Sequence, residues 1–175
     1  MDEFALVLPT AAYADQIAAY RREFLDAGSS MDGTGALRRM EDPLEWLAHT
    51  RLSLTPETVP EGLVQATEFL YVRQVDDRLV GMIHVRHSFN EDLRLYGGNI
   101  GYSVRPSERR RGYAKRMLAD CLPFCREIGL KRVLITCARE NEGSRRTILA
   151  NGGAYESTVL QAEEGKWLER YWITL

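Results

Sequence analysis

The sequence has few cysteines: Cys121, Cys125 and Cys137 are the three among 175 residues. Because three is an odd number and too few for a disulfide framework, we expect the chain to work in a reducing, cytoplasmic setting. Cys121 and Cys125 lie four positions apart on one face of a predicted helix, without another Cys/His pair nearby. We therefore expect two small buried side chains there rather than a zinc site, and we predict no metal.

Long apolar runs are also missing. No run approaches the roughly 18 residues that a membrane span needs, so no membrane contact is expected. The first residues lack the basic and apolar segments of a secretory signal. There are no repeats or low-complexity stretches, and the apolar (45%) and charged (27%) fractions are near the average of globular domains. These absences predict one domain over residues 1–175.

The net charge is small, with 23 Lys+Arg against 25 Asp+Glu, or −2. This balance does not favour general binding to nucleic acid. Residues 105–116, RPSERRRGYAKR, nevertheless concentrate positive charge around a single acid, Glu108. The basic side chains of this segment, called the basic segment below, are Arg105, Arg109, Arg110, Arg111, Lys115 and Arg116.

Apolar periodicity and turn residues predict alternating strands and helices. Strands are expected over residues 4–8, 69–75, 79–87, 100–104, 133–136, 154–160 and 168–175. A first helix is expected from a cap at Thr10 or Asp15 to Gly28. Further helices are expected over residues 42–52, 109–129 and 141–150, and Ser107 is expected to cap the helix over 109–129. Hairpins come first and one strand–helix–strand crossover follows. This order predicts an α+β fold with a mixed sheet covered by helices.

The basic segment joins a predicted strand to a predicted helix. The first N–H groups of a helix lack partners within it and carry the positive end of its dipole. Small residues at Gly112 and Ala114 would let an anion approach these groups, while Arg109 and Arg111 add charge. The pattern predicts a polyphosphate site, and the alternative is a solvated basic helix start. Neither GxGxxG after a strand nor GxxxxGK[ST] is present.

Residues 109–114, RRRGYA, fit Arg/Gln-x-x-Gly-x-Gly/Ala and resemble the acetyl-CoA signature of the GNAT acetyltransferase superfamily. The stretch Asn141-Glu142-Gly143-Ser144, leading to Gly152, resembles the family's later Asn-x-x-Ala/Ser helix and its closing glycine. The order of predicted elements also matches the family's fold. The resemblance covers nearly the whole chain and is strongest over residues 70–153. Residues 86–90, RHSFN, are similar to a stretch in uncharacterised bacterial members.

The resemblance implies a fold and a co-substrate, acetyl-CoA. The fold would be a mixed, mainly antiparallel central sheet of about seven strands flanked by helices, in which strands 100–104 and 133–137 splay apart around the thioester. Backbone groups of the first strand would pair with the pantetheine arm and hold the acetyl carbonyl. Residues 109–115 would hold the pyrophosphate, and two residues of the last helix would contact the pantetheine or phosphate region. The implied binding residues are Tyr102, Ser103, Val104, Arg109, Arg110, Arg111, Gly112, Tyr113, Ala114, Lys115, Asn141 and Ser144.

Two catalytic side chains common in the family are missing. Many members have a Glu near the start of the fourth strand as base and a Tyr on the later helix as acid. The matching positions here are Gly98 and Asn99 for the Glu, and Ile148 for the Tyr. His87 ends the strand expected to pair with residues 100–104, close to Asn99, and its ordinary pKa suits a base near neutral pH. We therefore predict His87 and Asn99 as catalytic residues.

The alternative for His87 is an exposed histidine at a strand end. Strand alternation places His84 on the opposite face, so at most one of the two histidines should reach the site. Glu68, Glu91 and Asp92 are carboxylates near the expected mouth of the cleft, and carboxylates of this kind are usually solvated.

The sequence thus predicts an acetyl-CoA-dependent N-acetyltransferase that acts on a small-molecule or peptide amine by direct attack on the thioester. The alternative is a catalytically inactive acyl-CoA-binding module, which the missing Glu and Tyr support. The acceptor pocket would be built from residues 15–52 and 154–175, whose mixed charges do not identify the acceptor. Residues 167–175 could form a homodimer or pack on their own sheet.

Overall fold

The strands form two sheets in the computed structural model of the chain, which describes residues 3–175. The first sheet has the order β1-β2-β3-β4 and the second has the order β5-β7-β6. The first contains β1 (Phe4–Val7), β2 (Ala66–Arg73), β3 (Arg78–Arg86) and β4 (Ile100–Val104). The second contains β5 (Arg132–Ala138), β6 (Ala154–Gln161) and β7 (Lys166–Thr174). Every strand in each sheet is antiparallel to its hydrogen-bonded neighbour.

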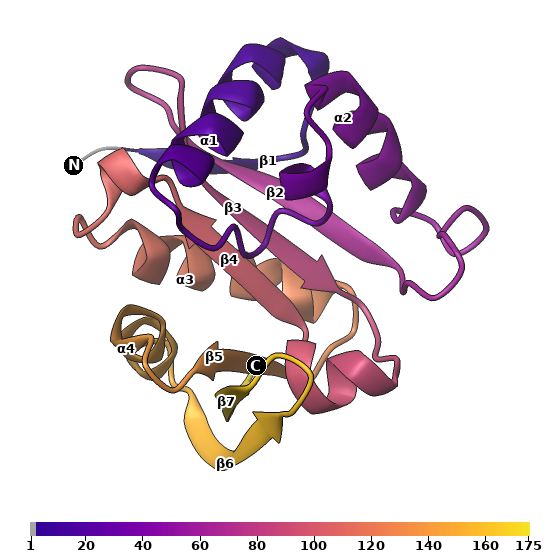
Figure 1. Cartoon of the computed structure of the whole chain (residues 1–175), viewed down its shortest axis with the longest axis vertical. Helices are drawn as coiled ribbons and strands as arrows, with labels where there is room; N and C mark the ends of the chain where they lie inside the picture. Colours follow the sequence, from indigo (N-terminus) through magenta and orange to yellow (C-terminus); the bar gives the residue numbers. More distant parts are fainter. Residues whose placement is uncertain (1–2) are drawn as a thin grey trace.

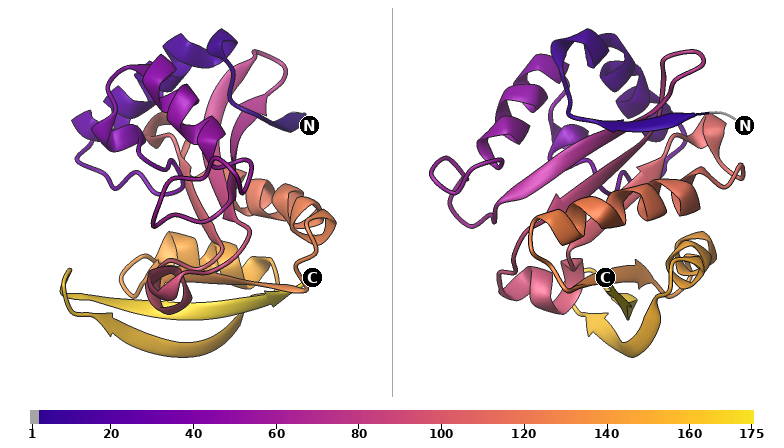
Figure 2. Two further views of the ribbon diagram at one scale, coloured as in Figure 1. Left: turned by 90° about the vertical axis from the view of Figure 1, so that its right-hand side faces the viewer. Right: turned by 180° about the vertical axis from the view of Figure 1, so that it is seen from behind.

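The helices cover both faces of the first sheet. They are α1 (Ala14–Asp26), α2 (Pro43–Leu52), α3 (Tyr113–Glu127) and α4 (Glu142–Ala150). α1 and α2 lie on one face of the first sheet, and α3 lies on the opposite face (Figures 1 and 2). α4 packs against α3 and against β5 of the second sheet. The chain passes from β4 through α3 to β5, which is the crossover that the element order predicts.

Two hydrophobic clusters fill the space between these layers. One lies between α1, α2 and the first sheet and includes Tyr20, Trp46 and Leu70. The other surrounds α3 and contains residues from both sheets, among them Ile100 of β4 and Val133 of β5. Because the second cluster is shared, α3 joins the two sheets through buried apolar contact.

The predicted fold class is confirmed, with corrections at several element boundaries. The helix expected from residue 109 begins at Tyr113, since residues 106–108 form a 3₁₀ turn and a left-handed backbone at Arg110 (φ 62°) prevents a helix there. Ser107 is therefore not the N-cap. α1 is capped by neither Thr10 nor Asp15, because a 3₁₀ turn over Ala11–Tyr13 precedes it.

The region expected as a loop between the third and fourth predicted strands contains a π-helical turn over Leu93–Gly97. Its carbonyls are tied to the second sheet: Thr136 donates to Tyr96 O at 2.6 Å, and Arg170 donates to the carbonyls of Arg94 and Leu95. The turn therefore fixes the start of β4 against β5 and β7.

Candidate functional site

The two sheets meet at Asn99, immediately before β4. Its backbone N–H donates to Leu134 O at 2.7 Å, and its side-chain Oδ1 accepts from Leu134 N at 2.8 Å. On the other side, Asn99 O accepts from Arg86 N at 2.7 Å and the side-chain Nδ2 donates to Arg86 O at 3.2 Å. The carboxamide thus occupies the place of a peptide group between β3 and β5. Beyond this junction β4 and β5 belong to separate sheets and diverge (Figure 1).

The start of α3 lies beside this divergence. Gly112 is the N-cap and has φ 79°, and Arg110 two residues earlier also has a left-handed backbone. The side-chain position of Gly112 is open, because an added Cβ would meet no atom within 4 Å. The N–H groups of the first turn have no acceptor within the helix. Left-handed residues next to a helix start expose successive N–H groups, which is a geometry that binds anions.

Glu108 anchors the loop between β4 and α3 to the protein interior. The carboxylate is buried and accepts from Arg73 at 2.9 Å and from Arg78 at 2.5 Å, while Arg111 lies 3.6 Å away. Burial alone would raise the pKa of Glu108, but the hydrogen bonds from Arg73 and Arg78 outweigh it and hold the pKa below its ordinary value. The single acid of the basic segment is therefore an internal anchor, and it leaves Arg110 and Arg111 exposed.

The side chain of Arg109 takes a different direction from its neighbours. It donates to Val104 O at 3.0 Å and to Ser29 Oγ at 2.8 Å. Its Cζ lies 5.3 Å from the centroid of the Phe24 ring. Arg109 therefore ties the loop to α1. Lys115 is exposed on the first turn of α3.

Tyr113 and Ala114, by contrast, are half-buried in the first turn of α3. The hydroxyl of Tyr113 accepts from Arg73 at 3.1 Å. The same guanidinium therefore holds both Tyr113 and Glu108, which couples the first turn to the loop before it.

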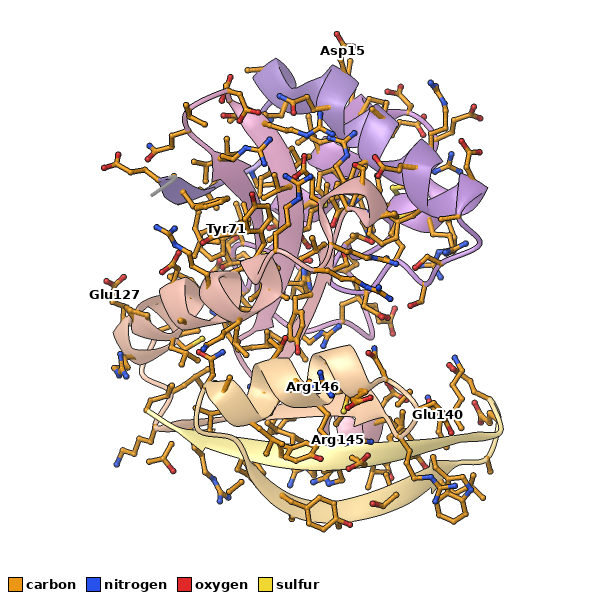
Figure 3. All side chains as sticks on the ribbon, turned by 90° about the vertical axis from the view of Figure 1, so that its left-hand side faces the viewer. Asp15, Tyr71, Glu127, Glu140, Arg145 and Arg146 are labelled. Carbon is orange, nitrogen blue, oxygen red and sulfur yellow. The ribbon has the colours of Figure 1, made fainter. Side chains whose placement is uncertain are left out.

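Tyr102 connects β4 to α4 across the divergence. Its hydroxyl is 2.8 Å from Ser144 Oγ, and burial raises its pKa. Asn141 caps α4 by accepting from Ser144 N at 3.1 Å. Arg145, the next residue on α4, points toward β7, where it pairs with Glu169 (Figure 3). The structure thus brings Tyr102, Asn141 and Ser144 together, whereas Ile148 is fully buried in the core.

On the opposite face of β4, Ser103 lies against α1. The hydroxyl of Tyr20 donates to Ser103 O at 3.0 Å and lies 2.9 Å from Ser103 Oγ. The carbonyl of Val104 already accepts from Arg109. Two of the backbone positions predicted to contact the pantetheine arm are therefore held by the fold on the α1 side.

His87 lies on the α3 side of the sheet. Its Nε2 is 2.9 Å from Thr67 Oγ1, its ring packs edge-on against Phe124 of α3, and burial lowers its pKa. Strand β3 ends at Arg86, one residue before His87. These contacts are those of a packed strand-end histidine rather than an exposed one, and its catalytic role stays a prediction.

His84 and Glu68 form a pair that motif matching missed. His84 Nδ1 is 2.7 Å from Glu68 Oε2, and the two residues are opposite each other in the β2–β3 register. Glu68 is only 2% exposed, so the expectation of a solvated carboxylate is wrong for this residue. The signal was available in the alternation of β3, which separates His84 from His87, but the pairing depends on a hairpin register that the motif does not specify.

Over residues 3–175, no helix combines the length and apolar character that a membrane crossing requires. Within the same range, no three His, Cys, Asp or Glu side chains are grouped in a way that could hold a metal ion. Cys121, Cys125 and Cys137 are free and buried, as packing residues would be.

Comparison with known proteins identifies the family. Residues 8–154 match the family model described as an acetyltransferase (GNAT) domain. No curated protein matches the sequence. Since the family model spans most of the chain, the chain belongs to the GNAT acetyltransferase family and is an acetyltransferase.

Solved structures show the same fold at low sequence identity. Ribosomal-protein-S5-alanine acetyltransferase from Vibrio fischeri is 14% identical with a TM-score of 0.75, over 99% of this chain and 94% of that one. The microcin C7 self-immunity acetyltransferase MccE, solved with acetyl-CoA and AMP, is 18% identical with a TM-score of 0.75, over 100% and 94%. Mycobacterium smegmatis RimJ, solved with CoA-disulfide, is 19% identical with a TM-score of 0.73, over 98% and 81%.

Proposed function

We propose that this protein is an N-acetyltransferase that transfers the acetyl group of acetyl-CoA to an amine of a small molecule or peptide. The observation that carries the proposal is the loop before α3, in which Arg110 and Gly112 have left-handed backbones and the side-chain position of Gly112, the N-cap of α3, is open. The loop stands where β4 and β5 diverge. The structures of MccE with acetyl-CoA and of RimJ with CoA-disulfide support this choice of co-substrate.

The residues of the loop fit a pyrophosphate. Backbone N–H groups from Arg111 to Ala114 would bind it, and the exposed side chains of Arg110, Arg111 and Lys115 would add positive charge. Glu108 does not oppose an anion here, because its charge is already paired with Arg73 and Arg78. Asn141 and Ser144 at the start of α4 would contact the pantetheine or phosphate region.

Acetyl-CoA supplies the acetyl group as an activated thioester. The protein would hold the acetyl carbonyl through backbone N–H groups over Tyr102, Ser103 and Val104, because the carbonyls of Ser103 and Val104 already accept from Tyr20 and Arg109. It would also orient the acceptor amine for direct attack, so that positioning provides a large part of the rate. The acceptor must lose a proton and the departing thiolate must gain one.

One feature favours the alternative of an acyl-CoA-binding module without catalysis. The positions of the usual base and acid carry Asn99, which is engaged with β3 and β5, and Ile148, which is buried in the core. Catalysis must therefore use other groups.

A thiol-release assay decides between the two functions. The protein would be incubated with acetyl-CoA and a panel of amines, comprising polyamines, amino acids, aminonucleosides and peptides with free N-termini. Thiol release that depends on one acceptor class is the expected result, and mass spectrometry of the product would locate the acetyl group. Binding of acetyl-CoA without thiol release from any amine would favour the binding module. Light scattering of the purified protein would separately distinguish a homodimer from a monomer.

A further inference from the structure

The side chains of Glu68 and His84 lie in a row that leads to the middle of β4. Glu68 on β2 pairs with His84 on β3, and His84 pairs with Gly101 on β4. Residues paired in this way project to the same face of an antiparallel sheet. This is the face covered by α1 and α2. Gly101 immediately precedes Tyr102, the first of the backbone positions proposed to hold the acetyl carbonyl.

Glycine at the end of this row leaves His84 without a side chain between it and the outer edge of β4. The nearest group above Gly101 is Gly33, whose N and Cα lie 3.2 and 3.3 Å from the position that a Cβ on Gly101 would take. His84 itself keeps 15% of its side chain exposed. Arg86 Nη2 lies 3.6 Å from the same position, so the row ends at the backbone of Gly33 and the guanidinium of Arg86.

Glu68 carries an unsatisfied oxygen. Its Oε2 contacts His84, but Oε1 is buried and has no hydrogen-bond partner among the described residues. The carboxyl lies at the wall of a cavity of about 200 Å³ lined by Leu8, Pro9, Thr10, Leu47, Thr50, Arg51 and Leu54. Burying a polar atom without a partner destabilises the folded state. A pair kept only for stability would not be expected to leave this atom unpaired.

We propose that His84 is the base that takes the proton from the acceptor amine, and that Glu68 is the residue that positions it. This inference rests on the proposed acetyl transfer. The amine nitrogen forms a bond to the thioester carbonyl carbon, the carbon–sulfur bond breaks, and the thiolate takes a proton from water. The proton lost by the nitrogen goes to Nε2 of His84, while Nδ1–H donates to Glu68 and keeps the ring in that tautomer.

The surroundings determine how the pair titrates. Burial raises the pKa of Glu68, and the positive charge of Arg86 partly offsets this rise. Burial lowers the pKa of His84, and the charges of Arg86 and His87 lower it further. Because the two groups share a hydrogen bond, they titrate together. The charged or titratable groups around the pair are Arg86 on β3, His87 directly after it, Tyr20 on α1, Cys121 on α3, and Arg51 on α2, which lines the same cavity as Glu68. Asp32 in the 27–42 loop acts on Arg86.

In its deprotonated form the pair is a Glu68 carboxylate that accepts a hydrogen bond from a neutral His84 imidazole. The first proton that the pair takes up is shared between the carboxylate and the imidazole. Its apparent pKa therefore lies above that of the buried imidazole alone. Since the base must be unprotonated, kcat/KM should rise with pH through this apparent pKa. In Glu68→Gln only the imidazole remains, so the acidic limb should move to lower pH and the plateau should fall.

The test compares wild type, His84→Gln, Glu68→Gln and the control Glu127→Gln, which changes an exposed carboxylate at the C-terminal end of α3, outside the pair and outside the expected pockets. kcat/KM would be measured from pH 5 to 9.5 with the acceptor that the amine panel identifies, and acetyl-CoA affinity would be measured by calorimetry. We expect His84→Gln to lower kcat/KM about 100-fold or more with its Kd within twofold of wild type. The acidic limb of Glu68→Gln should move down by about one pH unit or more.

Each result bears on the proposal. An active wild type with His84→Gln above a fifth of its kcat/KM overturns the role of His84 and leaves acetyl transfer intact. If no amine of the panel causes the wild type to release thiol, both the role of His84 and the proposed acetyl transfer are overturned. If His84→Gln does not fold, Glu68→Gln decides, and an unchanged acidic limb in that isosteric variant contradicts the proposal.

Discussion

At the scale of single residues, Glu108 shows how one side chain organises a binding loop. It is the only acid among the six cations of the basic segment, which makes it look like a minor counter-charge in the sequence. In the structure it is buried, and Arg73 and Arg78 from the β2–β3 hairpin reach it. The hairpin thereby fixes the loop whose N–H groups would meet the pyrophosphate.

Glu108→Gln should therefore destabilise the protein in a pH-dependent manner. The pKa of Glu108 lies below its ordinary value of 4.5, so its stabilising effect is present above pH 4.5 and is lost as the pH falls through the folded-state pKa. We expect the variant to lose about 2 kcal/mol of unfolding free energy at pH 7. The difference from wild type should shrink as the pH falls from 5 to 3, as measured by urea denaturation.

Glu142→Gln provides the matched control for this experiment. Glu142 pairs with Arg146 on α4, but both side chains are more than half exposed. Exposed pairs of this kind contribute about 0.5 kcal/mol or less. A Glu108→Gln deficit that stays constant from pH 7 to pH 3 would contradict the assigned role of the carboxylate.

At the scale of elements, the periodicity of the sequence predicts most strands and helices within a few residues. The β2–β3 hairpin and α2 were predicted because they depend on local alternation and periodicity. The structure adds that Asp42 caps α2 and that Pro43 lies in its first turn. The predicted start of α3, residue 109, was wrong by four residues, because the helix begins at Tyr113. No propensity signals a left-handed backbone at Arg110, which the anchored loop imposes.

The candidate site also has a part that local sequence predicts and a part that only the tertiary structure reveals. The motif located the loop before α3 from local spacing, because the phosphate-binding groups belong to consecutive residues. The Glu68–His84 pair joins two strands, and Asn99 joins two sheets, so both depend on tertiary register. Those contacts follow from how the strands align, which one sequence without its structure does not specify.

Gly112→Ala tests the loop as an element. The φ of 79° makes any side chain there strained by about 1 kcal/mol, and the added Cβ would enter the open space in front of the first-turn N–H groups. We expect acetyl-CoA affinity to fall about tenfold by calorimetry, which corresponds to about 1.4 kcal/mol.

Gly165→Ala separates the two effects in that variant. Gly165, between β6 and β7, also has a left-handed backbone (φ 63°) and open space around it. It should show the same strain in thermal unfolding but an unchanged Kd. Equal affinity in the two variants would mean that the position in front of the α3 N–H groups is not where the phosphates bind.

At the scale of the whole molecule, the two sheets are joined in three ways. Asn99 bridges them directly, the cluster around α3 contains residues of both, and the turn over Leu93–Gly97 is held by Arg170. A ligand lying between β4 and β5, with contacts to the α3 loop and to α4, would add a fourth connection. Occupation of the site should therefore stabilise the molecule as a unit rather than only the loop.

Acetyl-CoA should accordingly raise the melting temperature of the whole protein in a single transition. At a free concentration 100 times the Kd the stabilisation is about 2.7 kcal/mol, which corresponds to roughly 5–10 °C for a chain of this size. A single-stranded oligonucleotide at equal phosphate concentration should have little effect, because the net charge of −2 leaves attraction only at the basic segment. Circular dichroism would follow both sheets, and tryptophan fluorescence would be recorded on two variants, one that keeps only Trp46 of α2 and one that keeps only Trp172 of β7. Equal shifts by both probes are expected; stabilisation by the oligonucleotide, or two separated transitions, would contradict a phosphate site that couples the two sheets.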